Sequence, residues 1–121
     1  PERLRAWLVP SEGEKNVLRG FAASAGTVEG PARVIFSVEE LSTVQDGEIL
    51  GCSVTEPSWA PIFAKVRATV TDIGGVMSHA AIVAREYNIP AVLGTGVATQ
   101  RIRTGQRLRV DGDRGVVTIL D

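Results

Sequence analysis

A pair of glycines between a β-branched run and an alanine-rich run is the feature that most constrains how this chain can fold. Residues 66–73 are rich in Val, Thr and Ile and predict a strand. Gly74 and Gly75 permit positive φ angles and let another group come close to the main chain. The residues after them, up to Glu86, include several good helix formers. We therefore expect a strand, a tight turn and a helix in direct succession.

The start of the expected helix carries the only histidine of the chain, His79. The first amides of a helix have no internal partner and carry partial positive charge, so such an end can hold a phosphate. Residues 74–85 contain no Asp or Glu, and the hydroxyl of Ser78 can cap the helix or donate to a phosphate. A neutral imidazole keeps one nitrogen free to attack an electrophile. His79 is thus a candidate phosphoryl acceptor, with Gly74, Gly75 and Ser78 as candidates to support the phosphate.

Two further side chains belong to this hypothesis. Thr71 and Asp72, at the end of the expected strand, are candidates to orient the ring of His79. A lone histidine at a helix start is more often a cap, a surface residue or a hydrogen-bonded core group, so the local pattern alone leaves that interpretation open.

Cys52 is the only cysteine, and one cysteine with one histidine does not supply a zinc site, so no metal site is expected.

Residues 74–86, followed by residues 89–94, resemble the signature of the swivelling phosphohistidine domain, or mobile domain, of PEP-utilising enzymes. That family includes pyruvate phosphate dikinase, PEP synthase, enzyme I of the sugar phosphotransferase system, and ATP-driven antibiotic and phenol phosphotransferases. Residues 55–63 are similar to the segment before the catalytic strand in the dikinase branch, and residues 20–30 resemble the opening turn. The resemblance implies an α/β domain of the swivelling β/β/α type in which His79 is transiently phosphorylated.

Position 77 differs between branches of this family. Many members that use PEP, including PEP synthase, have Thr two residues before the histidine, whereas this chain has Met77. Methionine cannot hydrogen-bond a phosphate as threonine can. The chain is here more similar to the rifampin phosphotransferases and to phenylphosphate synthase, with PEP synthase next. PEP or pyruvate is therefore not favoured as the acceptor, and the acceptor stays open.

The resemblance implies a phosphoryl-carrier domain of a multidomain, ATP-dependent phosphotransferase of the dikinase type. The chain has no P-loop motif and is too short to hold a nucleotide-binding domain as well, so we expect it to bind no cofactor itself. ATP and Mg²⁺ are expected on a partner domain, and an acceptor-binding domain of the same enzyme is expected to take the phosphoryl group from His79. The isolated domain is then inactive. The alternatives are a non-catalytic swivelling interaction or regulatory module, and an accessory subunit of a hydrolase or dehydratase.

Composition narrows the class of partner. The chain has 121 residues, which suit one domain, and 13 basic and 14 acidic residues give a formal net charge of −1. Neither nucleic acid nor a membrane surface is favoured by this balance, and no apolar run reaches membrane-spanning length. A single cysteine excludes an internal disulfide framework and fits a reducing compartment, so we expect a cytoplasmic protein.

The chain is expected to consist of a lead-in segment and linker, residues 1–19, and the phosphohistidine domain, residues 20–121. A first residue that is not Met suggests a fragment of a longer polypeptide. Further strands are predicted at residues 17–21, 27–36, 47–54, 90–93, 106–110 and 116–120. Short helices are predicted at residues 38–41, 57–65 and 97–101, and a turn at residues 22–26. Gly30 and Pro31 predict a break in the second strand, and Ser37 with Glu40 predicts a capping box.

Overall fold

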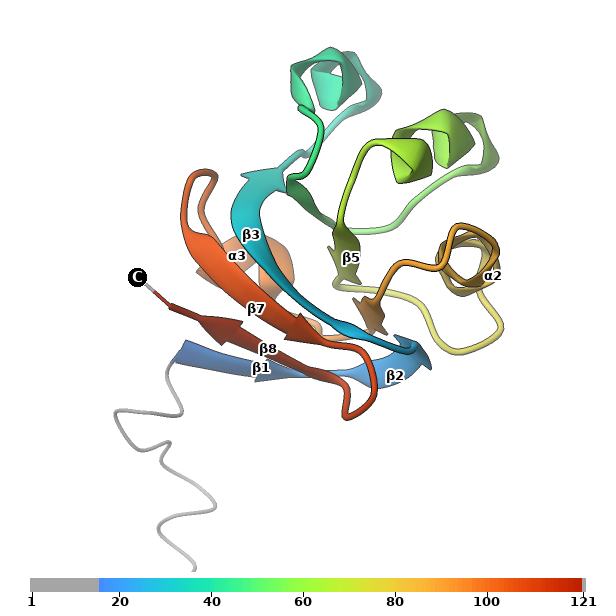
Figure 1. Cartoon of the computed structure of the whole chain (residues 1–121). Coiled ribbons are helices and arrows are strands. Elements are labelled where there is room, and N and C mark those ends of the chain that lie inside the picture. The colour runs from blue at the N-terminus through green and yellow to red at the C-terminus, as the bar shows by residue number, and fades with distance from the viewer. Residues whose placement is uncertain (1–15, 121) are drawn as a thin grey trace, which may run out of the picture.

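The computed structural model describes residues 16–120, in which strands alternate with short helices (Figure 1). The strands are β1 (Val17–Arg19), β2 (Phe21–Ser24), β3 (Thr27–Val34), β4 (Ile49–Cys52), β5 (Ala68–Thr71), β6 (Ala91–Leu93), β7 (Arg107–Asp111) and β8 (Val116–Ile119). The helices are the 3-10 helices η2 (Val38–Thr43) and η3 (Pro57–Ala64) and the α-helices α2 (His79–Glu86) and α3 (Ala98–Arg101). The predicted α/β class is confirmed.

The described strands form one sheet, in the order β1-β8-β7-β3-β4-β5-β6-β2. β1 and β2 lie at opposite ends of that order, although only Gly20 separates them in the sequence. The sheet therefore curls until its two edges meet, as in a barrel. Gly20 occupies the junction: its N–H donates to the carbonyl of Gly115 at 2.9 Å, and an added Cβ would lie 2.5 Å from the carbonyl oxygen of Leu93.

Strand β3 joins an antiparallel half of the sheet to a parallel half. Its first part pairs antiparallel with β7, its last part pairs parallel with β4, and β4, β5 and β6 continue the parallel half. The predicted break at Gly30 and Pro31 is wrong, because the strand runs through both residues. Pro31 is the last residue paired with β7, directly before the strand changes partner, which is where the loss of one N–H disturbs the ladder least.

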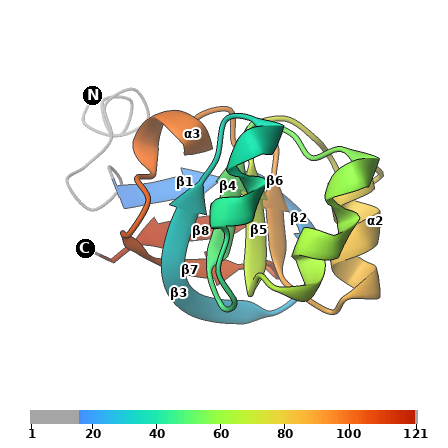
Figure 2. The ribbon, with the colours of Figure 1, turned by 90° about the horizontal axis from the view of Figure 1, so that it is seen from above.

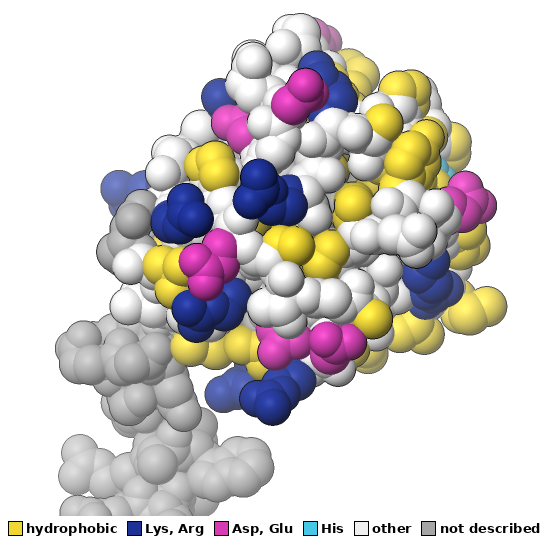
Figure 3. Space-filling model, viewed as in Figure 1, with side chains coloured by type: hydrophobic (Ala, Val, Ile, Leu, Met, Phe, Trp, Pro, Cys, Tyr) yellow, Lys and Arg dark blue, Asp and Glu magenta, His cyan; other side chains and the backbone are white. Residues whose placement is uncertain are grey.

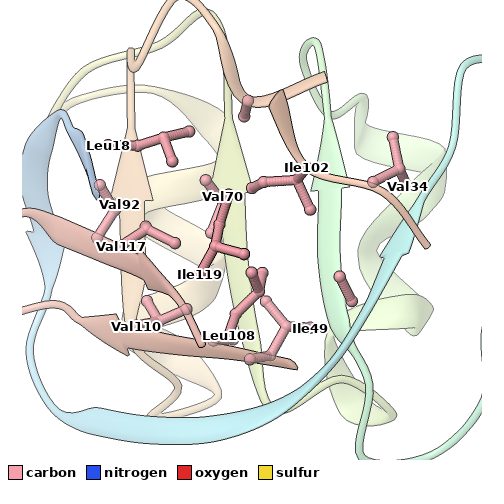
Figure 4. Packing of buried hydrophobic residues seen from close by; sticks show 13 residues of the cluster. Leu18, Val34, Ile49, Val70, Val92, Ile102, Leu108, Val110, Val117 and Ile119 are labelled. Atoms are coloured by element: carbon pink, nitrogen blue, oxygen red, sulfur yellow. The ribbon is translucent and has the colours of Figure 1, made fainter. Parts of the chain in front are cut away.

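Aliphatic side chains from both halves fill the interior of the curled sheet (Figure 4). In β7 and β8, buried residues alternate with more exposed ones, as expected for strands with one face on a core. The larger members of the cluster are Leu18, Val34, Ile49, Val70, Val92, Ile102, Leu108, Val110, Val117 and Ile119.

Helices α2 and η3 pack against each other outside the parallel half of the sheet (Figure 2). α2 buries Ala80, Ala81, Val83 and Ala84, and these small side chains let its backbone come close to β2, β5 and β6. α3 contacts β4 and β5 from the side of the interior cluster, to which Ala98 belongs. The layers are thus antiparallel sheet, parallel sheet and helix, which confirms the β/β/α arrangement.

Both helices expected early in the chain are 3-10 helices. Pro61 lies inside η3, where it removes one backbone donor, and this favours the tighter helix. Trp59 and Phe63 are buried core residues, 6% and 1% exposed. The predicted capping box of η2 is wrong in detail, because Ser37 makes no side-chain cap and Glu40 Oε2 accepts from the N–H of Phe36 at 3.1 Å.

The first part of the sheet also differs from the prediction. Residues 21–24, expected to be mostly turn, form β2 and pair with β6 around a bulge. The predicted domain boundary at residue 20 falls between β1 and β2, and β1 belongs to the sheet through its pairing with β8. The remainder of the predicted lead-in, residues 1–15, lies outside the described residues.

The end of α2, the turn of the closing hairpin and the single cysteine each have a defined local structure. Asn88 ends α2 with a φ of 57°. The closing hairpin is present, and Asp111 Oδ1 accepts from the N–H groups of Asp113 and Arg114, both at 3.1 Å, which stabilises its turn. Cys52 is 1% exposed, and burial, together with the charge of Asp72, raises the pKa of its thiol to about 12. Among the described helices, none is long and apolar enough to cross a membrane.

Candidate functional site

The candidate site lies where the parallel strands β4 and β5 end. Parallel strands bring their carboxyl ends to one edge of a sheet, and ligands of such sheets bind beyond that edge. The segment after β4 carries Thr55, and the segment after β5 carries Gly74 and Gly75 and leads into α2 at His79. Figure 1 shows the segment after β5 passing below α2 before it enters that helix. The segment after β4 and the segment after β5 thus come together at one imidazole.

The two glycines have different local environments. Gly74 has a φ of 130°, which side chains rarely tolerate, and an added Cβ would lie 3.3 Å from Ser78 Oγ. Gly75 has no such backbone angle, and an added Cβ would meet no atom within 4 Å. The backbone therefore requires glycine at position 74, whereas glycine at position 75 leaves open space beside the loop.

Ser78 is the N-cap of α2, which confirms one of its two predicted roles. It has extended backbone angles, φ −74° and ψ 166°, and its Oγ accepts from the N–H of Ala81 at 3.4 Å. The same hydroxyl donates to the carbonyl of Gly75 at 2.8 Å. The serine hydroxyl thus joins the glycine turn to the first turn of the helix, and its proton is already donated within the loop.

The ring of His79 is partly exposed and is held on one side. Thr55 Oγ1 lies 3.0 Å from Nδ1, and Thr55 itself is 6% exposed. The edge of the Phe63 ring meets the imidazole at 90°, with 6.3 Å between the ring centroids. Within residues 16–120, no group hydrogen-bonds Nε2. The geometry therefore fixes Nδ1 and leaves Nε2 available.

The turn before α2 and the first turn of that helix contain backbone donors without a partner in the described residues. In the described part of the chain, nothing accepts from the N–H groups of Val76, Met77, His79 or Ala80. The first turn of α2 has no acidic residue, so the partial positive charge of the helix start is not neutralised locally. The imidazole is thus partly exposed, and the N–H groups of these residues have no partner within the described residues.

Thr71 and Asp72, the candidates to orient the ring, have other partners in the structure. Thr71 Oγ1 donates to the carbonyl of Ile73 at 2.8 Å. The carboxylate of Asp72 accepts from the N–H of Thr99 at 3.0 Å and from its hydroxyl at 2.5 Å, and so caps α3. Both residues shape the turn and its neighbour, and the contact to the imidazole nitrogen comes from Thr55.

Two residues of the site had no role in the sequence-based prediction. Thr55 lies in a segment that carries the resemblance, but nothing in its sequence environment identifies it as the partner of the histidine. The signal that finds it is topological, because residues after adjacent parallel strands come together. Arg85 was recognised only as a helix former, and its side chain contacts the glycine turn. Among the described residues, no three His, Cys, Asp or Glu side chains are grouped as a metal site.

The structure places one partly exposed histidine at a helix start whose first amides have no partner in the described residues, and such a helix start can bind an anion. The family model described as PEP-utilising enzyme, mobile domain, matches residues 44–115. The chain therefore belongs to the mobile-domain family of PEP-utilising enzymes. Its relatives include phosphotransferases and PEP synthase, so the domain is part of an enzyme family.

Three curated relatives cover most of the chain. The chain is 53% identical over 111 residues to chondramide synthase cmdD of Chondromyces crocatus, with 92% of the chain covered. It is 50% identical over 103 residues (85% of the chain) to rifampicin phosphotransferase of Streptomyces sviceus, and 46% identical over 113 residues (89% of the chain) to phosphoenolpyruvate synthase of Aquifex aeolicus. The solution structure of an enzyme I protein matches 66% of the chain and 33% of its own length, with a TM-score of 0.59 and 34% identity.

The chain spans a small part of these curated relatives: 3% of the chondramide synthase, 12% of the rifampicin phosphotransferase and 13% of the PEP synthase. Those proteins therefore contain other domains. The resemblance to the rifampin phosphotransferase branch and to PEP synthase, predicted from the sequence, is confirmed.

Proposed function

We propose that this domain carries a phosphoryl group on Nε2 of His79 between two other domains of an ATP-dependent phosphotransferase. The observation that carries the proposal is the arrangement of the imidazole. Thr55 engages Nδ1, while within residues 16–120 neither Nε2 nor the first amides of the helix that carries it have a partner. A hydroxyl can accept from Nδ1–H or donate to a deprotonated Nδ1, so Thr55 suits the ring before and after transfer. The family supports a role in phosphoryl transfer.

In the first half-reaction, the lone pair of Nε2 attacks a phosphorus atom of ATP, and the P–O bond to the leaving group breaks with its electron pair on oxygen. In the second, an acceptor oxygen attacks the same phosphorus and the P–N bond breaks, which regenerates the imidazole. Such transfers depend mainly on alignment and charge stabilisation. The amides around Gly75 and α2 supply that stabilisation without any group that must reorganise.

ATP and Mg²⁺ are proposed to bind a partner domain, and the acceptor a third domain, of a cytoplasmic enzyme. The small share of each relative that the chain covers leaves room for both. Met77 is 81% exposed beside the histidine and offers no hydrogen bond to a phosphorylated acceptor. Rifampicin phosphotransferase and PEP synthase are relatives of similar identity, so the acceptor is left open in this proposal.

The test uses the full-length enzyme and ATP labelled with ³²P at both the β and γ positions, because either phosphoryl group could be carried. We expect acid-labile, base-stable label on the peptide that contains His79, and none on this domain in His79→Ala. Asp113→Asn, on the exposed hairpin turn, serves as a control that keeps wild-type labelling. Acid-labile label on this domain in His79→Ala would refute the proposal. A wild-type enzyme that turns over but never labels His79 would favour a non-catalytic module.

A further inference from the structure

Arg85 reaches back from the end of α2 to the turn that precedes the helix. Its Nε donates to the carbonyl of Ala23 in β2 at 2.8 Å, and its Nη2 donates to the carbonyl of Val76 in the glycine turn. Long side chains of a helix lean toward its N-terminus, so this position is well placed for the contact. One guanidinium thereby links the turn between β5 and α2 to strand β2.

The contact with Val76 fixes the orientation of a whole peptide group. The peptide between Val76 and Met77 is trans, as are all peptides in the described residues, so its C=O and N–H point in opposite directions. When Arg85 holds the carbonyl, the N–H of Met77 points away from the arginine, and no described group accepts from it. The cation also polarises the peptide, which makes that N–H a stronger donor.

The alternative orientation of this peptide would oppose phosphate binding. A carbonyl oxygen carries partial negative charge, and turned toward the histidine it would repel a phosphoryl group. The charge of Arg85 therefore acts through one peptide, by keeping the oxygen of Val76 on the β2 side. Arginine suits this role because its planar fork donates to two carbonyls from separate elements, whereas the ammonium of lysine is a point donor.

We propose that Arg85 is a positioning residue for phosphoryl transfer: it holds the Val76 carbonyl so that the Met77 N–H is presented to the phosphoryl group on His79. This inference rests on the proposed carrier function. Arg85 touches no transferred atom, and its effect passes through the peptide that it holds. A merely structural role, as a link between α2, β2 and the turn, is the competing explanation.

The two explanations differ in a single-turnover experiment on the full-length enzyme, in which both the rate constant and the final amount of phosphohistidine are measured. The variants are Arg85→Lys, which keeps the charge, and Arg85→Gln, which keeps a donor without charge. Arg101→Met is the matched control, because its guanidinium also donates to a backbone carbonyl, that of Val17 at 3.4 Å, on the β1 side of the sheet. A structural role would lower the amount of phosphohistidine and leave the rate constant of the folded fraction unchanged.

We expect both Arg85 variants to reach wild-type amounts of phosphohistidine with rate constants at least about tenfold lower, and kcat to fall while KM for ATP stays constant. Arg101→Met is expected to keep the wild-type rate constant. Wild-type rate constants in both Arg85 variants would refute the positioning role and leave the carrier function intact. Absence of any phosphohistidine in the wild type would instead refute the carrier function, and this inference with it.

Discussion

The hydrogen bond between Thr55 and His79 engages one imidazole nitrogen and leaves the other available for the proposed transfer. Thr55 is buried, and its hydroxyl lies 3.0 Å from Nδ1, whereas Nε2 has no partner in the described part of the chain. Because the 121 residues contain one histidine, the state of this ring can be observed in the domain without overlap from another histidine of the same domain. The contact fixes the ring as well, since rotation about its side-chain bonds would break it.

Replacing Thr55 with Val should slow phosphorylation of His79. Valine has nearly the same shape but cannot hydrogen-bond Nδ1, so the ring loses its anchor at a cost of about 0.5–1.5 kcal/mol, or a rate reduction of up to about tenfold. Thr55→Ser keeps the hydroxyl and is expected to retain most of the rate. The measurement is the rate of acid-labile labelling, together with ¹⁵N shifts that report the tautomer of His79. An unchanged tautomer and rate in Thr55→Val would contradict this assignment.

The sequence predicts the histidine better than it predicts the residues around it. His79, Ser78 and the glycines are close in sequence, so local rules place them together, and Ser78 is the N-cap as predicted. Thr55 contacts the histidine from the segment after β4. Arg85 contacts the glycine turn from six residues further along α2. Their roles depend on the order of strands and on side-chain directions, which a local pattern does not contain.

At the level of elements, the turn between β5 and α2 contains two glycines with different constraints. Gly74 has a positive φ, and an added Cβ would lie 3.3 Å from Ser78 Oγ, whereas neither constraint applies to a side chain added at Gly75. The neighbouring turn supports this arrangement, because Gly94 lies so close that an added Cβ would come within 2.6 Å of the Gly74 carbonyl oxygen. The turn after β6 is thus packed directly against the turn that leads to the histidine.

The two substitutions Gly74→Ala and Gly75→Ala are expected to act on different properties. Gly74→Ala should destabilise the domain by about 1–2 kcal/mol, because alanine is strained at its positive φ. Gly75→Ala should leave the free energy of unfolding within about 0.5 kcal/mol of wild type but slow the labelling of His79, since its methyl enters the space proposed for the phosphate. Denaturant unfolding and labelling rates measure the two effects. Normal labelling in Gly75→Ala would remove this residue from the site.

Element boundaries were predicted less well than element order, for physical reasons. The split of the first strand at Gly20 arises because the curled sheet joins its edges there, which is a property of the whole sheet. β3 continues through Pro31 because the strand changes partner directly after that residue. In both cases pairing between distant segments overrides the local signal, as is usual for β structure.

For the whole molecule, the described residues form a closed sheet with helices against its parallel half, and the histidine lies at one end. Figure 3 shows hydrophobic side chains gathered on the side of α2 and η3, while basic and acidic side chains alternate over the rest of that face. Ile73, Val76 and Met77, all in the turn before α2, are exposed. A closed core with the candidate histidine at one end suits the proposed carrier role, in which the domain moves as a unit and presents the same atoms to successive partners.

An ion pair links β3 to the residue directly before β4. Arg33, in the part of β3 that pairs with β4, donates to both carboxylate oxygens of Glu48, with Nε–Oε1 and Nη2–Oε2 distances of 3.0 Å. Glu48 is 8% exposed; burial disfavours its charge, but the bonds from Arg33 and from the N–H of Gln45 outweigh burial and lower its pKa. The same pair raises the pKa of Arg33.

This pair predicts a specific pH dependence of stability. A carboxyl group whose pKa is lower in the folded state stabilises the protein at pH values above its unfolded pKa, and the contribution is lost as the pH falls through the folded pKa. Arg33→Met leaves a buried, unpaired carboxylate, and we expect it to cost about 1–3 kcal/mol at pH 7. Without Arg33, only the bond from the Gln45 N–H opposes the effect of burial, so the pKa of Glu48 is higher in the variant than in wild type. The folded variant then takes up a proton at a higher pH than folded wild type, and the gap should narrow as the pH falls through these two pKa values.

Denaturant unfolding of wild type and Arg33→Met between pH 3 and pH 8 measures this gap. Arg114→Met is the control, because the exposed Arg114 lies 3.9 Å from Asp111 and such a surface pair contributes little. A gap of constant size across this range would mean that Arg33 stabilises the sheet through packing of its methylene groups, and the charge of Glu48 would then have no part in holding β3 to β4. A gap that closes in acid would show that the charge of Glu48 stabilises the protein. The ion pair with Arg33 would then help to hold β3 to β4, one of the parallel strands whose ends form the candidate site.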